Sequence, residues 1–156
     1  MRKLTTIFLG LTLGSLTILE LPAQAANTQQ NAASTKAPAT TIAQALSKKF
    51  QGKPVVVEIY ASWCPACRNV APTVSQLKKE YAGKANFLVL DVSDKGSTAR
   101  ARNAAQQAGL SQFFSQNISQ TGLVAIIDPA TGNILAQHRN NSDKSDYTSV
   151  LDAAIR

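Results

Sequence analysis

The sequence is poor in the residues that bind metals or cross-link small domains. Its 156 residues include two cysteines and one histidine. A closed zinc site needs more ligands than these, so carboxylates would have to complete it, and we expect neither a metal nor an organic cofactor. Haem attachment is excluded because Arg68, and not a histidine, follows the second cysteine. The histidine, His138, is expected at the surface of a hairpin.

Aromatic and charged residues are also scarce, at 6% and 16% of the chain. The formal net charge is +7, but the basic residues are scattered and aromatic side chains do not interleave with them. A nucleic-acid surface needs such clustering, so we expect no nucleic-acid partner. The basic excess predicts a solvated surface, with weak attraction to acidic partners or anionic membranes as the alternative. The densest basic pairs are Lys48/Lys49, Lys78/Lys79 and Arg100/Arg102.

The first residues have the order of a secretory signal peptide. "MRK" supplies positive charge, Leu4–Leu19 is mostly apolar, and Ala23 and Ala25 form an A-x-A cleavage pattern. We therefore expect residues 1–25 to be a signal peptide. An uncleaved membrane anchor is the alternative, although the apolar run is shorter than the roughly 20 residues that span a bilayer.

The remaining chain divides by composition. Residues 26–40 are small and polar without apolar periodicity, which predicts a flexible linker. Residues 41–156 alternate helical and strand patterns, which predicts one α/β domain, a mixed β-sheet of about four strands flanked by helices. Strands are expected at 53–61, 86–93, 123–128 and 133–139, and helices at 41–50, 65–82, 97–109, 110–117 and 145–155.

Some details of these elements can be predicted as well. The apolar runs at 53–61 and 86–93 predict buried strands. In the last helix, Ser145 or Asp146 is expected to cap the N-terminus. Its buried face should then hold Tyr147, Val150, Leu151 and Ile155.

Both cysteines lie in the stretch "EIYASWCPACRNVAP", residues 58–72. A redox pair, part of a metal site and a structural staple are the three interpretations. A disulfide stabilises more as the loop that it closes lengthens, and only a proline and an alanine separate Cys64 from Cys67. The pair is therefore better explained by reactivity than by cross-linking.

The position of Cys64 favours a reactive thiolate. The predicted strand ends there and a helix begins, with Pro65 in the first helical turn, where no N–H is needed. Unpaired N–H groups and the positive end of the helix dipole lower a thiol pKa. Cys64 is expected to attack a disulfide, and Cys67, better buried one turn further on, to resolve the mixed disulfide.

This segment resembles the active site of the thioredoxin superfamily, especially exported thioredoxin-like disulfide oxidoreductases. The resemblance rests on the apolar strand, on Trp63 before Cys64-Pro65-Ala66-Cys67, and on Pro72 within the helix. The order of elements from residue 41 to residue 155 agrees as well. The resemblance implies a thioredoxin-like fold and a substrate groove beside Trp63, Pro65 and Ala66, with core packing as the alternative for Trp63.

The resemblance also gives Glu58 a role, because family members carry an acidic residue beneath the cysteines that helps to move the proton of the second one. Burial would raise its pKa into a useful range. The alternative is a glutamate on a solvent-facing edge or paired with a lysine. The chain departs from the family at Thr121-Gly122, where a cis-proline usually faces the cysteine pair, so the substrate groove is expected to differ there.

The predicted function is an exported thiol–disulfide oxidoreductase that exchanges disulfides with partner proteins and with a redox partner that donates or accepts electrons. A non-catalytic thioredoxin-fold adaptor is the alternative. We expect a monomer in the periplasm, with a thylakoid lumen as the other compartment, and membrane attachment only through an uncleaved leader. Catalytic roles fall to Cys64, Cys67 and Glu58, and substrate binding to Trp63, Pro65, Ala66, Thr121 and Gly122.

Overall fold

The computed structural model describes residues 46 and 48–155. The predicted signal peptide and linker lie outside these residues, as does most of the helix predicted at 41–50, of which Leu46 and 48–50 are helical. The elements that follow are β1 (Val55–Tyr60), α2 (Pro65–Glu80), β2 (Asn86–Asp91), α3 (Lys95–Gln107), α4 (Ser111–Asn117), β3 (Leu123–Ile127), β4 (Ile134–Arg139) and α5 (Ser145–Ala154).

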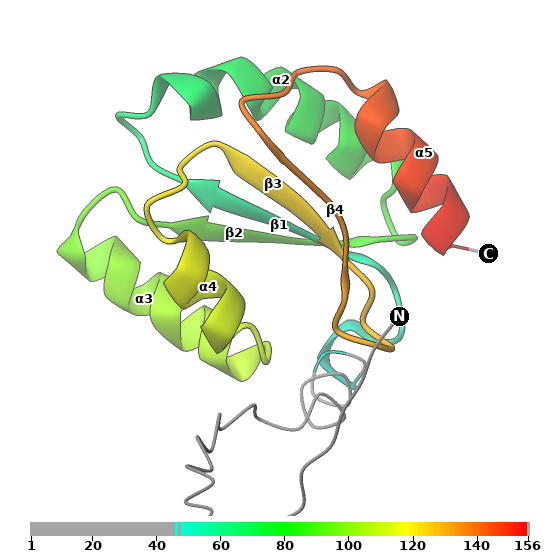
Figure 1. Ribbon diagram of the computed structural model, residues 1–156, viewed down its shortest axis with the longest axis horizontal. Coiled ribbons are helices and arrows are strands. Elements are labelled where there is room, and N and C mark those ends of the chain that lie inside the picture. The colour runs from blue at the N-terminus through cyan, green and yellow to red at the C-terminus, as the bar shows by residue number, and fades with distance from the viewer. Residues whose placement is uncertain (1–45, 47, 156) are drawn as a thin grey trace, which may run out of the picture. The chain divides into compact units, whose positions relative to one another are not determined.

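The strands form one mixed sheet in the order β2-β1-β3-β4. β1 pairs with β2 in parallel and with β3 antiparallel, and β3 pairs antiparallel with β4. Helices α2 and α5 cover one face, and α3 and α4 cover the other (Figure 1). The prediction of a mixed four-stranded sheet flanked by helices is confirmed.

Alternation along the strands divides the core between the two faces, since successive side chains point to opposite sides of a sheet. Under α2 and α5, the core contains Val56, Val70, Val74, Leu77, Val124, Ile126, Tyr147 and Leu151. Under α3 and α4, it contains Val55, Val57, Ile59, Leu90, Ala101, Ala105, Phe113, Phe114, Leu123, Ala125 and Ile127.

Burial differs between the first two strands. β1 lies between two strands and is buried from Val55 to Ile59, as predicted. β2 was expected to be buried too, but most of it is only half-buried, and Val89 is 40% exposed. That prediction is wrong because β2 is an edge strand, with a neighbour on one side only.

The last helix begins differently from the prediction. Its N-cap is Lys144, which makes no side-chain capping bond, while Ser145 and Asp146 lie in the first turn. The Asp143 carboxylate accepts the Ser145 N–H at 2.9 Å and so satisfies a free donor of that turn. Ile155 follows the helix and is 36% exposed, so it does not continue the buried face.

The topology brings four strand ends to one edge of the sheet. The parallel strands β1 and β2 end there at Tyr60 and Asp91. Because β3 is antiparallel to β1, and β4 to β3, this edge also holds the start of β3 at Leu123 and the end of β4 at Arg139. Helix α2, whose first residue is Pro65, starts just beyond β1.

Among the described residues, no helix is both long and apolar enough to cross a membrane.

Candidate redox site

Cys64 joins β1 to α2 as the N-cap of the helix. Its backbone is extended (φ −85°, ψ 118°), and its Sγ accepts a hydrogen bond from the Cys67 N–H at 3.1 Å. Serine, threonine and aspartate usually cap helices in this way, and here a sulfur takes the place of their oxygen. The cap therefore directs a backbone donor at the sulfur that would carry negative charge.

Both cysteines are free thiols in the structure, and each is 1% exposed. Cys67 was expected to be better buried than Cys64, but in solvent exposure the two do not differ, so Cys64 is also closed off from solvent. The cause is a second segment, Thr121-Gly122, that packs over the cysteines. On the side that faces the sheet, the Cys67 thiol donates to the Ile59 carbonyl of β1 at 3.8 Å.

The surroundings move the two thiol pKa values in opposite directions. Burial by itself would raise the pKa of Cys64, but hydrogen bonds from the Cys67 and Thr121 side chains outweigh it. Together with backbone N–H groups, they lower the pKa of Cys64 from its usual value of 9.0. Burial, the hydrogen bond to Cys64, and nearby negative charge raise the pKa of Cys67 to about 11. Proton loss should therefore occur first at Cys64.

Glu58 is buried on the central strand, with 6% of its surface exposed. Its strand neighbours are Val89 and Val124, so it lies on the face covered by α2, and it is not on a solvent-facing edge. Burial raises the pKa of its carboxyl, against the opposing charge of Lys78. The Glu58 charge in turn helps to raise the pKa of Cys67, which links the two groups electrostatically.

A cavity of about 310 Å³ opens beside Glu58. It lies between α2 and the edge strand β2, because its walls include Lys78 and Ser75 of α2 and Val89 of β2. A buried carboxyl that moves protons needs contact with solvent or with a titrating neighbour. The cavity provides contact with solvent, and the charge of Glu58 acts on Cys67 electrostatically.

Gly122 contacts the loop between the cysteines directly. Its N–H donates to the Ile59 carbonyl at 2.8 Å, the same oxygen that faces Cys67. A Cβ at this position would lie 2.5 Å from Ala66 Cβ and 3.2 Å from the Cys67 nitrogen. Thr121 is buried beside it, and its side chain helps to lower the pKa of Cys64. These two residues thus face the pair where the resemblance placed them.

Trp63 is 61% exposed, next to the buried Cys64, so it is not a core residue. Its indole Nε1–H donates to the Ser93 carbonyl at 3.2 Å. The Ser93 hydroxyl accepts the Ser62 N–H at 2.8 Å and donates to the Asp91 carboxylate. Ser93 therefore holds the segment in front of the cysteines at two points. Pro65 is also exposed and Ala66 half-buried, so the three residues form one surface around the pair.

Ser93, Arg139 and Asn140 were not predicted from the sequence. Arg139 Nε–H donates to the Thr121 carbonyl at 3.2 Å, and the Asn140 N–H donates to the Gly122 carbonyl at 2.9 Å. All three follow or end strands that meet at the edge of the sheet beside Cys64. The rule that functional groups gather at such strand ends is the signal that could have indicated them.

His138 was expected at the surface, but it is half-buried. Its ring lies edge-on to the Tyr147 ring of α5, with centroids 5.2 Å apart and an interplanar angle of 74°. In the described part of the chain, no three or more His, Cys, Asp or Glu side chains gather in a way that could hold a metal ion. His138 is thus a packing residue between β4 and α5.

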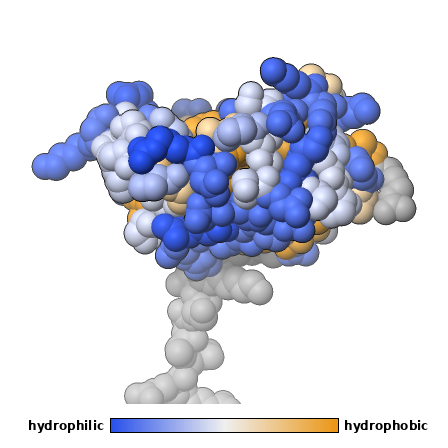
Figure 2. All heavy atoms as spheres, turned by 90° about the horizontal axis from the view of Figure 1, so that it is seen from above, coloured by the Kyte–Doolittle hydropathy of each residue, from blue (hydrophilic) through white to orange (hydrophobic). Residues whose placement is uncertain are grey.

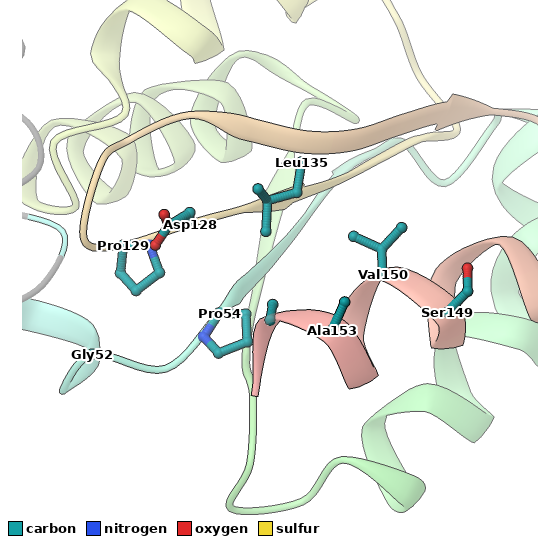
Figure 3. A pocket seen from close by; sticks show the side chains of 9 residues that line it. Gly52, Pro54, Asp128, Pro129, Leu135, Ser149, Val150 and Ala153 are labelled. Carbon is teal, nitrogen blue, oxygen red and sulfur yellow. The ribbon is translucent and has the colours of Figure 1, made fainter. Parts of the chain in front are cut away.

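A second hollow, of about 450 Å³, lies at the other end of β1 (Figure 3). Pro54, just before β1, lines it together with Pro129, Leu135 and Val150. Since Cys64 follows the far end of the same strand, this pocket is not part of the redox site. The face seen in Figure 2, from above the view of Figure 1, is mostly hydrophilic, with small hydrophobic areas between.

Comparison with known protein families gives a match over more than half of the chain. The family described as Thioredoxin matches residues 34–117, which include both cysteines and Glu58. Thioredoxin C-2 of Corynebacterium nephridii is 32% identical over 121 residues, covering 74% of this chain and 97% of that protein. The similarity therefore extends over nearly the whole of a complete thioredoxin.

Other relatives match over shorter segments. The thioredoxin-like protein HCF164, chloroplastic, of Arabidopsis thaliana is 49% identical over 43 residues, 28% of this chain and 16% of that protein. The thiol:disulfide interchange protein TxlA homolog of Synechocystis is 46% identical over 43 residues, 28% of this chain and 24% of that protein. Among solved structures, a thiol:disulfide interchange protein from Chlorobium tepidum has a TM-score of 0.49 and 23% identity, covering 70% of this chain and 85% of that one.

Proposed function

This chain belongs to the thioredoxin family of thiol–disulfide oxidoreductases, and we propose that it is exported and exchanges disulfides with partner proteins through Cys64 and Cys67. The observation that carries the proposal is the hydrogen bond from the Cys67 N–H to Cys64 Sγ at the start of α2. It stabilises a thiolate on Cys64, and the thiolate is the form of cysteine that attacks disulfides.

Thiol–disulfide exchange between the protein and its partner conserves atoms and electrons without a cofactor. In the reducing direction, the Cys64 thiolate attacks one sulfur of a partner disulfide, forms a mixed disulfide and expels the other partner sulfur as a thiolate. Cys67 then loses its proton and attacks Cys64 Sγ, which releases the second partner thiolate and leaves a Cys64–Cys67 disulfide. Two electrons pass to the partner, whose thiolates take up protons. The oxidising direction is the same sequence reversed.

Glu58 is suited to accept the Cys67 proton in the second step. The pKa of Cys67 is about 11, so at neutral pH its thiol needs a base. The pKa of Glu58 is raised by burial, which makes its carboxylate a stronger base than an exposed one. The cavity beside Glu58 gives the proton a route to solvent.

Export is supported by the N-terminal sequence, in which a basic start, an apolar run and an A-x-A pattern follow one another. The periplasm is the proposed compartment. The similarity to a chloroplastic protein of Arabidopsis and to a protein of Synechocystis supports a thylakoid lumen as the alternative. Mass spectrometry of the protein recovered from the producing cell would test this, because cleavage after Ala25 predicts an N-terminus at Ala26.

Trapping tests the redox function. With Cys67 changed to Ala, the mixed disulfide cannot be resolved, so partner proteins should accumulate on Cys64 and separate from it on reduction. The matched control is the Cys64→Ser, Cys67→Ala double variant, which should trap nothing. Equal trapping by both variants, or no turnover of any disulfide by the unmodified protein, would contradict the proposal.

A non-catalytic adaptor is the second candidate, and the 1% exposure of Cys64 is the observation that favours it. An attacking sulfur must be reached by its substrate, whereas a binding module has no such need. A variant with both cysteines changed to Ser separates the two. Full biological activity of that variant would favour the adaptor, and loss of activity would favour the oxidoreductase.

A further inference from the structure

Arg139 ends β4 at the edge of the sheet where the cysteines lie. Its position is held from both sides, because it pairs with Leu123 in the sheet and the next residue, Asn140, donates its N–H to the Gly122 carbonyl at 2.9 Å. The guanidinium is held too, since Nε–H donates to the Thr121 carbonyl at 3.2 Å. A long side chain at an exposed position is thus fixed at both its backbone and its head.

The acceptor of this hydrogen bond belongs to the segment that covers the cysteines. Thr121 precedes Gly122, whose backbone lies so close to Ala66 that an added Cβ would be 3.0 Å from the Ala66 carbonyl carbon. The side chain of Thr121 is buried on the cysteine side and helps to lower the pKa of Cys64. One residue therefore separates the guanidinium of Arg139 from the sulfur that would form the mixed disulfide.

In the described part of the chain, Arg139 forms no ion pair with a carboxylate, whereas Lys144 pairs with Glu80. The bond to Thr121 uses Nε–H and leaves the donors of both terminal nitrogens open. A guanidinium held in this way presents a planar fork that matches a carboxylate. Such a fork is better suited to bind an acidic side chain than to stabilise the fold.

The opposite side of the redox site differs in charge. The sheet order places Asp91 on the edge strand β2 and Arg139 on the other edge strand, β4. The Asp91 carboxylate is already occupied by Ser93, which donates to it from both its backbone N–H and its hydroxyl. Two cations thus lie near the pair: Arg68, exposed on α2 directly after Cys67, and Arg139, which a hydrogen bond holds on the Thr121 side.

We propose that Arg139 is a specificity-determining residue that binds a carboxylate side chain, Asp or Glu, next to the reactive cysteine of the partner protein. The proposal rests on the proposed redox function, because it concerns the partner segment that docks over Cys64. It assigns to this site partners with an acidic residue beside their disulfide, and it disfavours partners with a lysine there, since like charges repel.

Disulfide peptides that differ at one position test the proposal. Each peptide carries Glu, Gln or Lys directly before or directly after one of its two cysteines, and reduction by the reduced protein gives kcat/KM. For the better of the two positions, the unmodified protein should prefer Glu over Gln by roughly threefold to tenfold, as a partly exposed charge pair allows, with Lys poorest. The preference should shrink at high salt.

Arg139→Gln should remove the preference of Glu over Gln, and Arg139→Lys should retain part of it, because lysine keeps the charge but lacks the fork. Lys79→Gln is the matched control for loss of one positive charge. Lys79 is exposed near the end of α2, about 18 Å along the helix from Cys67, and its variant should keep the full preference.

The ratio between peptides separates recognition from structure. If Arg139 only supports the fold, Arg139→Gln lowers kcat/KM for all peptides equally and leaves the ratio unchanged, which would overturn the proposal. Equal use of the peptides by the unmodified protein would overturn it as well. The uncharged substrate 2-hydroxyethyl disulfide keeps the two proposals apart. If the protein reduces this substrate but shows no preference among the Glu, Gln and Lys peptides, the role of Arg139 is contradicted. If it reduces no disulfide at all, the redox function is contradicted.

Discussion

Gly122 and Ala66 come so close that no side chain fits between them. A Cβ on Gly122 would lie 2.5 Å from Ala66 Cβ, and the Gly122 backbone has a positive φ of 80°. The loop that holds the two cysteines is therefore covered by backbone of the turn that precedes β3. Five predictions concern this arrangement and the groups around it.

Gly122→Ala should destabilise the protein and disturb the redox site. A positive φ costs an alanine about 1 kcal/mol, and the contact with Ala66 adds about 1–3 kcal/mol of overpacking. Gly83→Ala is the matched control, because Gly83 has a similar φ of 76° but nothing within 4 Å of the added Cβ. Urea unfolding should show the larger loss for Gly122→Ala, and only that variant should lose disulfide turnover. Equal losses of stability would show that the contact with Ala66 is easily relieved.

Titration of the reduced protein should show two separate thiolate transitions. The Cβ chemical shifts of ¹³C-labelled cysteine are expected to move first at a pH below 9.0, as Cys64 ionises, and again near pH 11, as Cys67 ionises. Cys67→Ser should keep the first transition and remove the second, and Cys64→Ser should remove the first. A single transition near the pKa of an ordinary cysteine would contradict the assignment of Cys64 as the nucleophile.

The pH dependence of the stability of the reduced protein should follow the same two pKa shifts. Because the pKa of Cys64 is lowered on folding, the reduced protein gains stability as pH rises from that pKa to 9.0. Because the pKa of Cys67 is raised, it loses stability between pH 9.0 and about 11. A Cys64→Ser, Cys67→Ser variant should lack both effects when urea midpoints are compared across this range.

Glu58→Gln should make the protein more stable and less active at pH 7. Burial raises the pKa of Glu58, so stability falls as pH rises from 4.5 through the raised pKa, and an amide avoids this loss. Without the carboxylate, proton transfer from Cys67 should slow by about a hundredfold or more. Glu80→Gln makes the same chemical change at an exposed position and should do neither. A Glu58→Gln variant with unchanged turnover at neutral pH would remove Glu58 from the mechanism.

Ser93→Ala should loosen the segment around Trp63. The variant loses the bonds of the hydroxyl to Ser62 and Asp91, at a cost of about 1–2 kcal/mol, while the backbone bond to Trp63 remains. Trp63 is the single tryptophan of the chain, so its fluorescence anisotropy reports this segment directly and should fall. Peptide disulfide reduction should slow through a higher KM. Ser115→Ala, at an exposed serine on α4, should change neither quantity.

Much of the fold could be predicted from the sequence because the signals are local. Apolar runs indicated the four strands. Gly52 marked the turn before the first strand, and Pro129 marked the turn between the last two. Predictions that depended on neighbours in space were less accurate. The run at 86–93 is as apolar as a buried strand, but β2 lies at the edge of the sheet. The composition of a strand does not reveal which strands lie beside it. The N-cap of α5 was misplaced because Asp143, which lies before the helix, takes the hydrogen bond.

The sequence by itself determined that Cys64 and Cys67 are separated by one helical turn behind a strand, because spacing and local propensity place a thiol at the start of a helix. The tertiary structure alone decided what surrounds them. Thr121, Ser93 and Arg139 are far from the cysteines along the chain, and they meet there because mixed strand pairing brings the ends of β1, β2 and β4 and the start of β3 to one edge. Long-range pairing depends on how the whole sheet packs, and for that reason no single segment of the chain encodes the surroundings of the two cysteines.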